Sequence, residues 1–98
     1  MKTRPLPTKE RLCYLFYYNK ETGKLYARFK TQGHPIGRHG SLKPNGYLYT
    51  QVDGVVYLTH RLIWCYENGS IPEGQYIDHK DGDTLNNKLE NLRPVSLK

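Results

Sequence analysis

The sequence predicts an α+β domain in which antiparallel β-hairpins fill the N-terminal half and a helix follows them. Asp53-Gly54 separates two strand-like runs, residues 47–52 and 55–59, and Asp-Gly between such runs is a strong hairpin signal. Apolar residues recur at spacings of three and four over residues 60–68, as they do in an amphipathic helix. The 98 residues are enough for one small domain.

A second hairpin is expected nearer the N-terminus, behind a short arm. Residues 1–10 contain two prolines and mixed charge and predict an extended arm. Residues 11–18 are apolar and aromatic, and residues 24–29 alternate between polar and apolar, so both predict strands. Residues 19–23 end in glycine and are typical of a turn that joins two such strands.

Residues 30–46 are rich in glycine, proline and basic side chains and predict a long loop. Loops of this length are often functional, and a basic one suits DNA phosphates. Arg38, His39 and Lys43 are the DNA contacts that we expect from it, and His34 is a better phosphate contact than a metal ligand. A solvated linker is the alternative, and the sequence leaves both open.

The helix over residues 60–68 has recognisable start and stop signals. Thr59 is expected to cap its N-terminus, and Gly69 is expected to end it in the left-handed conformation. We expect Trp64 in the core, and the expected buried face comprises Leu62, Ile63, Cys65 and Tyr66.

The C-terminal segment predicts little regular structure. Residues 75–79 are expected to form a short strand, and residues 84–93 an irregular, Asn-rich connection. Pro94 suits the first turn of a helix, so we expect a last helix to begin there, truncated by the end of the sequence.

The composition favours a polyanionic partner. Lys and Arg number 15 against nine Asp and Glu, for a net charge of +6. Nucleic acid is favoured over a membrane, because no basic amphipathic helix and no apolar run of about 18 residues is visible. Cys13 and Cys65 lie in apolar runs and are expected to be buried free thiols. No signal-peptide pattern opens the sequence, so we expect a reducing, cytoplasmic setting.

Asp78-His79 is the candidate centre of chemistry. A carboxylate is a hard ligand for Mg²⁺ or Mn²⁺, and a neutral imidazole can take a proton from water near neutral pH. Phosphodiester hydrolysis needs both an activated water and a cation that offsets the charge growing on the phosphate. Adjacent side chains of a strand point to opposite faces, so the two serve one site only where the strand ends or twists, open to solvent and lined by positive charge. Taken alone, the pair is common by chance and indicates a surface ion pair more often than a catalytic site.

Five separated motifs surround this dipeptide. They run in the order THRLIW, GSIPEG, IDHKDGD, NN and ENLR between Thr59 and Arg93. Their order and spacing resemble the HNH endonuclease family, in the branch found in phages and among group I intron homing enzymes.

The resemblance is strongest over residues 45–98, and residues 11–46 are similar to the N-terminal β part of the same family. It implies a single HNH domain over residues 11–98. Residues 11–58 would form a β-rich DNA-binding part, and residues 59–98 a ββα-metal (His-Me finger) motif, with its last helix truncated.

Site roles follow from the same resemblance. His79 corresponds to the general base, and Asp78 to a ligand of a divalent metal, with Mg²⁺ or Mn²⁺ expected. Asn91 corresponds to the family's central asparagine, whose side chain bonds the loop backbone and holds the base histidine in place. The implied partner is double-stranded DNA, bound by a monomer or a homodimer.

The family's second protein ligand lies about nine residues beyond Asn91, and the sequence runs to Lys98. Three explanations remain open. The sequence is a fragment; or Asn86, Asn87 or Asp81 substitutes for that ligand; or the protein binds DNA or a protein partner without cutting.

Other residues have weaker functional expectations. Arg61 and Arg93 are expected to contact phosphate, although Arg93 could equally pair with Asp81, Asp83 or Glu90. His60 is a candidate supporting residue that is more often structural. Asn86 and Asn87 are expected to shape the loop through side-chain to backbone bonds.

Overall fold

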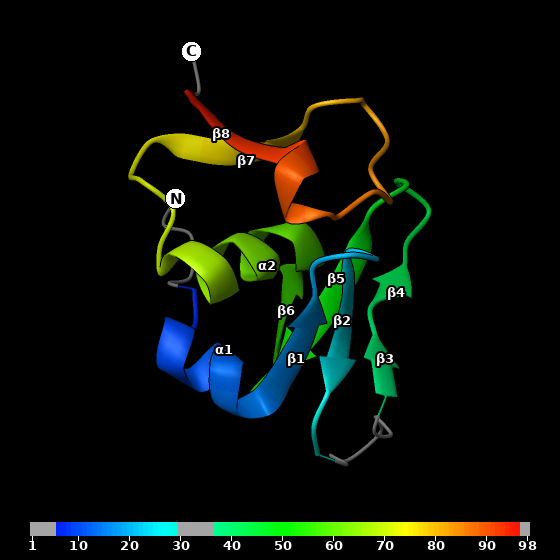
Figure 1. Cartoon of the computed structure of the whole chain (residues 1–98), viewed down its shortest axis with the longest axis vertical. Coiled ribbons are helices and arrows are strands. Elements are labelled where there is room, and N and C mark those ends of the chain that lie inside the picture. The colour runs from blue at the N-terminus through cyan, green and yellow to red at the C-terminus, as the bar shows by residue number, and fades with distance from the viewer. Residues whose placement is uncertain (1–5, 30–36, 97–98) are drawn as a thin grey trace.

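The computed structural model describes residues 6–29 and 37–96, with side chains in the second range from residue 40 onward. These residues form two α-helices and three antiparallel sheets (Figure 1). With the strands numbered along the chain, the sheets have the orders β1-β2-β3, β4-β5-β6 and β7-β8. This is the expected α+β class. The elements are α1 (Lys9–Leu15), β1 (Phe16–Asn19), β2 (Lys24–Ala27), β3 (Gly37–His39), β4 (Ser41–Leu42), β5 (Leu48–Val52), β6 (Val55–Leu58), α2 (Thr59–Asn68), β7 (Gln75–His79), the 3-10 helix η1 (Leu89–Asn91) and β8 (Leu92–Ser96).

Helix α1 corrects the strand expected over residues 11–18. Thr8 starts the helix, because its hydroxyl oxygen accepts a hydrogen bond from the Arg11 N–H at 3.1 Å. Leu12 is then buried, and the extended backbone begins only at Phe16. The apolar run 11–18 therefore serves a helix and a strand in turn. The end of the expected arm, from Lys9, is helical as well.

The hairpin of β1 and β2 is confirmed, with Tyr17 opposite Tyr26 in its antiparallel register. Its turn closes through the Gly23 N–H, which donates to the Asn19 carbonyl at 2.8 Å. Strand β2 ends at Ala27 rather than at residue 29.

The long loop expected over residues 30–46 is only partly a loop. Residues 30–36 lie outside the described part of the chain. Strand β3 pairs with β2, and β4 pairs with β5. Both are three residues long or shorter, and such short strands depend on hydrogen bonds from a neighbouring strand, a contact that local composition does not reveal.

The hairpin of β5 and β6 is confirmed with its turn at Asp53-Gly54. The φ angles there are 51° and 83°, as a two-residue hairpin turn requires. Helix α2 ends at Gly69, as expected, with a φ of 93°. The expected cap is wrong: Leu58 occupies the N-cap position, and the Thr59 hydroxyl is 2.7 Å from that of Thr50 instead.

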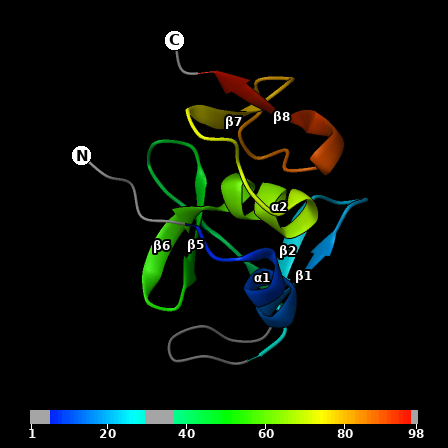
Figure 2. The ribbon, with the colours of Figure 1, turned by 90° about the vertical axis from the view of Figure 1, so that its left-hand side faces the viewer.

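Helix α2 lies at the centre of the molecule. Figure 2 shows β5 and β6 on one side of it, β1 and β2 on the other, α1 below and β7–β8 above. Its inner residues are buried as expected, except that Tyr66 and Trp64 are half-buried and pack against the core. The Cys65 thiol is buried and Cys13 is half-buried, and neither forms a disulfide. The core comprises Leu12, Phe16, Tyr18, Leu25, Ala27, Val52, Leu62, Ile63, Cys65, Ile77 and Leu92.

Strand β7 matches its prediction, but the segment after it does not. Residues 89–91 form η1, and residues 92–96 form β8, which pairs with β7 and places Pro94 opposite Ile77. The helix expected at Pro94 is therefore wrong. A proline lacks an N–H, which a two-stranded sheet tolerates because each strand has a free edge. Within the described ranges, no helix is long and apolar enough to cross a membrane.

Gly23 is the position where the N-terminal hairpin meets the C-terminal half. Its φ is 75°, and a Cβ there would lie 2.6 Å from the Lys88 nitrogen and 2.8 Å from the Asn87 carbonyl carbon. The hairpin turn thus packs directly on the backbone of the segment that follows β7.

We expect Gly23→Ala to lower the free energy of unfolding by about 2 kcal/mol or more, from left-handed strain and the backbone clash together. Gly54→Ala is the matched control, because Gly54 has a φ of 83° and no atom within 4 Å of an added Cβ. It should cost only the strain, roughly 1–2 kcal/mol. Urea denaturation of both variants measures the difference, and equal losses would contradict the close contact.

Candidate active site

His79 is the last residue of β7 and is 5% exposed. The burial of β7 alternates, which places Ile77 and His79 on the side of α2. The Nε2 atom of His79 lies 2.7 Å from the amide oxygen of Asn87, itself 2% exposed. The expectation of a solvent-open imidazole is therefore wrong. The buried ring has a polar partner in Asn87, and the core residue Leu92 is its cross-strand neighbour.

Two further rings enclose His79. The His60 ring lies 4.6 Å away and the Tyr47 ring 6.1 Å away, centre to centre. His60 is 5% exposed and hydrogen-bonds the Ile77 carbonyl. Burial, and then the neighbouring His79, lower the pKa of His60 to about 4. His60 is thus a neutral support between α2 and β7, which favours the structural role over direct contact with DNA.

Asp78 lies on the other face of β7. Its side chain is 38% exposed and forms an ion pair with Arg93, its cross-strand partner on β8, at 3.2 Å. Both contacting Arg93 nitrogens reach the same oxygen, Oδ2. The sequence predicts that Arg93 contacts phosphate or pairs with Asp81, Asp83 or Glu90. In the described residues its ion-pair partner is Asp78 instead. The surface ion pair considered for Asp78 is present.

Asn91 fastens the loop that begins directly after His79. Its amide oxygen accepts the Asp81 N–H at 3.1 Å, and its amide nitrogen donates to the Asn86 carbonyl at 2.9 Å. Its own carbonyl accepts the Lys80 N–H at 2.7 Å. This matches the loop-bonding part of the expected role of Asn91. The residue that touches the histidine, however, is Asn87.

The proposed substitutes for a second metal ligand are engaged inside this loop. Asp81 accepts hydrogen bonds from the Asn86 and Asn91 amides at 2.9 Å and from the Asp83 N–H at 2.8 Å. These hydrogen bonds lower the pKa of the Asp81 carboxyl, and the bond from Asn86 has the largest effect. Asn87 is bonded to His79. No cluster of three or more His, Cys, Asp or Glu side chains suited to a metal occurs in residues 6–29 and 37–96.

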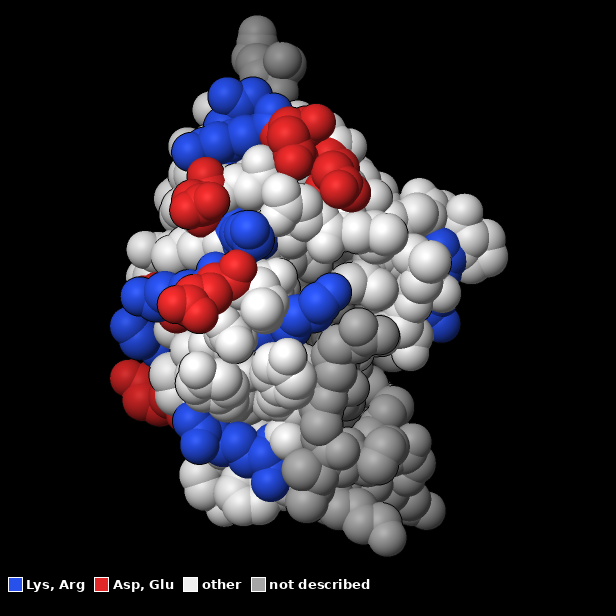
Figure 3. Space-filling view, turned by 45° about the vertical axis from the view of Figure 1, so that its right-hand side comes forward, with Lys and Arg blue, Asp and Glu red and all other residues white. Residues whose placement is uncertain are grey.

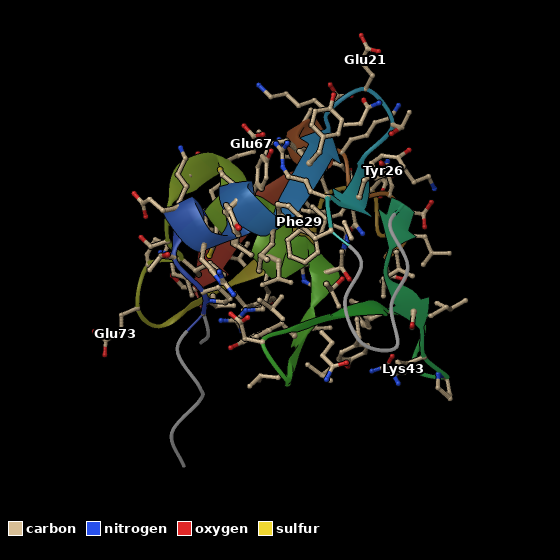
Figure 4. All side chains as sticks on the ribbon, turned by 90° about the horizontal axis from the view of Figure 1, so that it is seen from below. Glu21, Tyr26, Phe29, Lys43, Glu67 and Glu73 are labelled. Carbon is tan, nitrogen blue, oxygen red and sulfur yellow. The ribbon has the colours of Figure 1, made fainter. Side chains whose placement is uncertain are left out.

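The expected phosphate contacts are dispersed. Lys43 is exposed beside the end of β4, at the periphery of the molecule (Figure 4). Arg61 is half-buried on α2, and its Nε is buried with no hydrogen-bond partner in the described part. The side chains of Arg38 and His39, like all of His34, lie outside that part. On the face in Figure 3, basic side chains are interspersed with acidic ones.

Comparisons with known proteins indicate which family this part of the chain resembles. Residues 57–97 match the family model described as HNH endonuclease. The C-terminal part of this chain is therefore similar to the HNH endonucleases. Its match includes α2, β7, the loop and β8, and therefore every residue of the candidate active site except Tyr47.

Individual relatives support the same family. Protein 3.8 of Escherichia phage T7 is 56% identical over 34 residues, 35% of this chain and 28% of that protein. YosQ, an SPbeta prophage-derived protein of Bacillus subtilis whose name assigns it to the HNH homing endonucleases, is 40% identical over 53 residues, 54% of this chain and 31% of its own length. The matches thus span less than a third of these relatives.

A solved structure extends the likeness to the N-terminal half. The HNH homing endonuclease I-HmuI, in a structure described as showing its DNA binding and cleavage, is 26% identical with a TM-score of 0.61. The match covers 83% of this chain and 46% of that one.

The depressed pKa of His60 predicts a dependence of stability on pH. Because its pKa is about 4 in the folded state and ordinarily 6.5, the unfolded state binds more protons between these values. The contribution of neutral His60 to stability is therefore complete above pH 6.5. On acidification below that pH, the free energy of unfolding falls by about 1.4 kcal/mol per pH unit, about 3 kcal/mol in total. Urea denaturation across this window measures the slope.

His60→Phe is the control for that slope. It keeps an aromatic ring against His79 and removes the titrating group, so stability of the variant should be nearly flat over the same window. An unchanged slope in this variant would assign the effect to another group.

Proposed function

We propose that this chain is part of a metal-dependent DNA endonuclease that hydrolyses phosphodiester bonds, with His79 as general base and Asp78 as metal ligand. The observation that carries the proposal is the buried, hydrogen-bonded imidazole at the end of β7, within the matched HNH region. A neutral imidazole held in one orientation is suited to take a proton from an attacking water.

Asp78 fits a divalent cation in a limited way. Arg93 contacts only Oδ2, so Arg93 leaves the other carboxylate oxygen for a hard ion. One protein carboxylate suits Mg²⁺, which keeps several waters and takes phosphate oxygens from its substrate; Mn²⁺ has the same preference for oxygen ligands. When bound, such an ion offsets the charge that grows on the phosphate and leaving oxygen.

The proposed substrate is double-stranded DNA, and the net charge of +6 supports it. Arg61, half-buried on α2, is the first expected phosphate contact, because a guanidinium binds phosphate oxygens through charge-assisted hydrogen bonds. Arg93 is 54% exposed beside Asp78 and is the second expected phosphate contact. A monomer would nick one strand, and cutting both would need a homodimer.

We expect the chain to relax supercoiled plasmid in the presence of Mg²⁺ or Mn²⁺. His79→Ala should lower the nicking rate by about 100-fold or more, because it removes the proton acceptor. Asp78→Ala should lower it as well. The measurement is the rate of conversion to open circles at several metal concentrations.

Glu73→Ala is the matched control for the loss of a carboxylate, because Glu73 projects from the turn before β7 at the edge of the molecule (Figure 4). Its rate should equal that of the unchanged chain. Relaxation that persists in His79→Ala would remove His79 from the proposed role.

A second candidate function is DNA binding without cleavage. It is favoured by one observation, the placement of Asp78 and His79 on opposite faces of β7, with the carboxylate already paired to Arg93. Under this alternative the chain occupies DNA or a protein partner, and no relaxation is seen at any protein or metal concentration.

Both functions predict salt-dependent DNA binding. Log K should fall linearly with log salt, with a slope of about −0.9 per phosphate neutralised. Arg61→Gln should weaken binding and flatten this slope to a similar degree on DNA of unrelated sequences. Lys9→Gln removes the same charge from α1 and should change neither the affinity nor the slope. Fluorescence anisotropy with short duplexes measures both, and identical effects of the two variants would show that only net charge matters.

A further inference from the structure

We infer that Asn87 is the positioning residue of the proposed base. Its amide oxygen accepts the hydrogen on Nε2 of His79 and so leaves Nδ1 as the ring nitrogen that can take a proton. The role of Nδ1 as a proton acceptor rests on the proposed nuclease activity. The hydrogen bond between Nε2 and Asn87 is independent of that activity.

The donor and acceptor follow from the chemistry of the two groups. The amide oxygen of Asn87 can only accept, and a neutral imidazole carries one N–H. With 2.7 Å between Nε2 and Oδ1, that hydrogen must be on Nε2. Both residues are at most 5% exposed, so water does not compete for the contact, and an unpaired nitrogen there would be costly.

Asn87 is itself fixed by the N-terminal hairpin, far away in sequence. The Tyr18 hydroxyl donates to the Asn87 carbonyl at 2.5 Å. Burial raises the pKa of Tyr18 to about 12, so its hydroxyl remains protonated and able to donate. The backbone of Gly23 packs against residues 87 and 88. The β1–β2 hairpin thus sets the position of the amide that orients His79.

The two asparagines therefore have separate tasks. Asn91 bonds Asp81 and Asn86 and shapes the loop, whereas Asn87 contacts the imidazole. His60 packs against that imidazole and hydrogen-bonds the Ile77 carbonyl. The His79 ring is thus held through its Nε2 and by a neighbouring ring, which leaves Nδ1 for chemistry.

Nuclear magnetic resonance on the full chain with ¹⁵N-labelled histidine tests the hydrogen bond directly. At mildly alkaline pH, above the ordinary pKa of histidine, we expect a one-bond ¹H–¹⁵N signal from Nε2 of His79, slow to exchange with water. The chain has four histidines, and His79→Gln assigns the signal. A ring hydrogen found on Nδ1 of His79 would overturn the inference.

Variants of Asn87 test its role. Asn87→Leu should abolish the slow Nε2–H signal and lower the nicking rate about 10- to 100-fold, whereas Asn87→Asp, which keeps an acceptor oxygen, should retain the signal and much of the rate. Tyr18→Phe should speed exchange of that hydrogen, and Tyr17→Phe, at an exposed position of the same strand, should not. A slow signal that persists in Asn87→Leu would overturn the assignment.

The two proposals can fail separately. A protected Nε2–H in a chain that never nicks DNA would uphold the role of Asn87 as the partner of His79 and defeat the nuclease. Nicking that depends on His79 while the hydrogen lies on Nδ1 would uphold the nuclease and defeat this inference.

Discussion

The contact between His79 and Asn87 is the constraint on which the rest of the site depends. A buried imidazole stays in place only if its ring nitrogens find partners, because an unpaired polar group in the interior costs about as much as one or two ordinary hydrogen bonds contribute. The connection between β7 and β8 supplies the amide oxygen, and the β1–β2 hairpin holds that connection through Tyr18 and Gly23. The N-terminal half of the chain therefore builds the site although the proposed catalytic groups all lie in the C-terminal half.

Charge is separated across β7. On the inner face, His60 has a pKa lowered to about 4 and stays neutral beside His79, which avoids the repulsion of two imidazolium rings 4.6 Å apart. On the outer face, Asp78 and Arg93 form their ion pair with both side chains partly in water, where a pair contributes little to stability. The strand thus separates the two buried histidines from the ion pair on the surface.

The sequence predicts best what local signals determine. The Asp53-Gly54 turn, the helix ended by Gly69 and strand β7 are all present, because glycine at positive φ and hydrophobic periodicity act over a few residues. Three of the errors concern elements whose stability comes from elsewhere: β3 and β4 exist through their neighbours, and β8 forms despite Pro94 because it pairs with β7. Helix α1 is different, because the Thr8 cap that starts it is a local signal that the strand prediction passed over. Within the site, the motifs point to His79 and its flanking residues. The sequence predicts Asn91 as the residue that holds the histidine and assigns Asn87 only to shaping the loop, whereas the contact is made by Asn87. No pattern marks Tyr18, which lies 69 residues from Asn87 along the chain.

The end of β7 decides whether the two central residues can act together. Because Asp78 and His79 project from opposite faces, one phosphate can meet both only around the end of the strand, where His79 is the last residue and the backbone turns away at Lys80. Asn91 fixes that turn, since it binds Lys80 through its carbonyl and Asp81 through its side chain. Asn91 therefore determines where β7 stops. The contact with Asn87 determines how the His79 ring is oriented at that end.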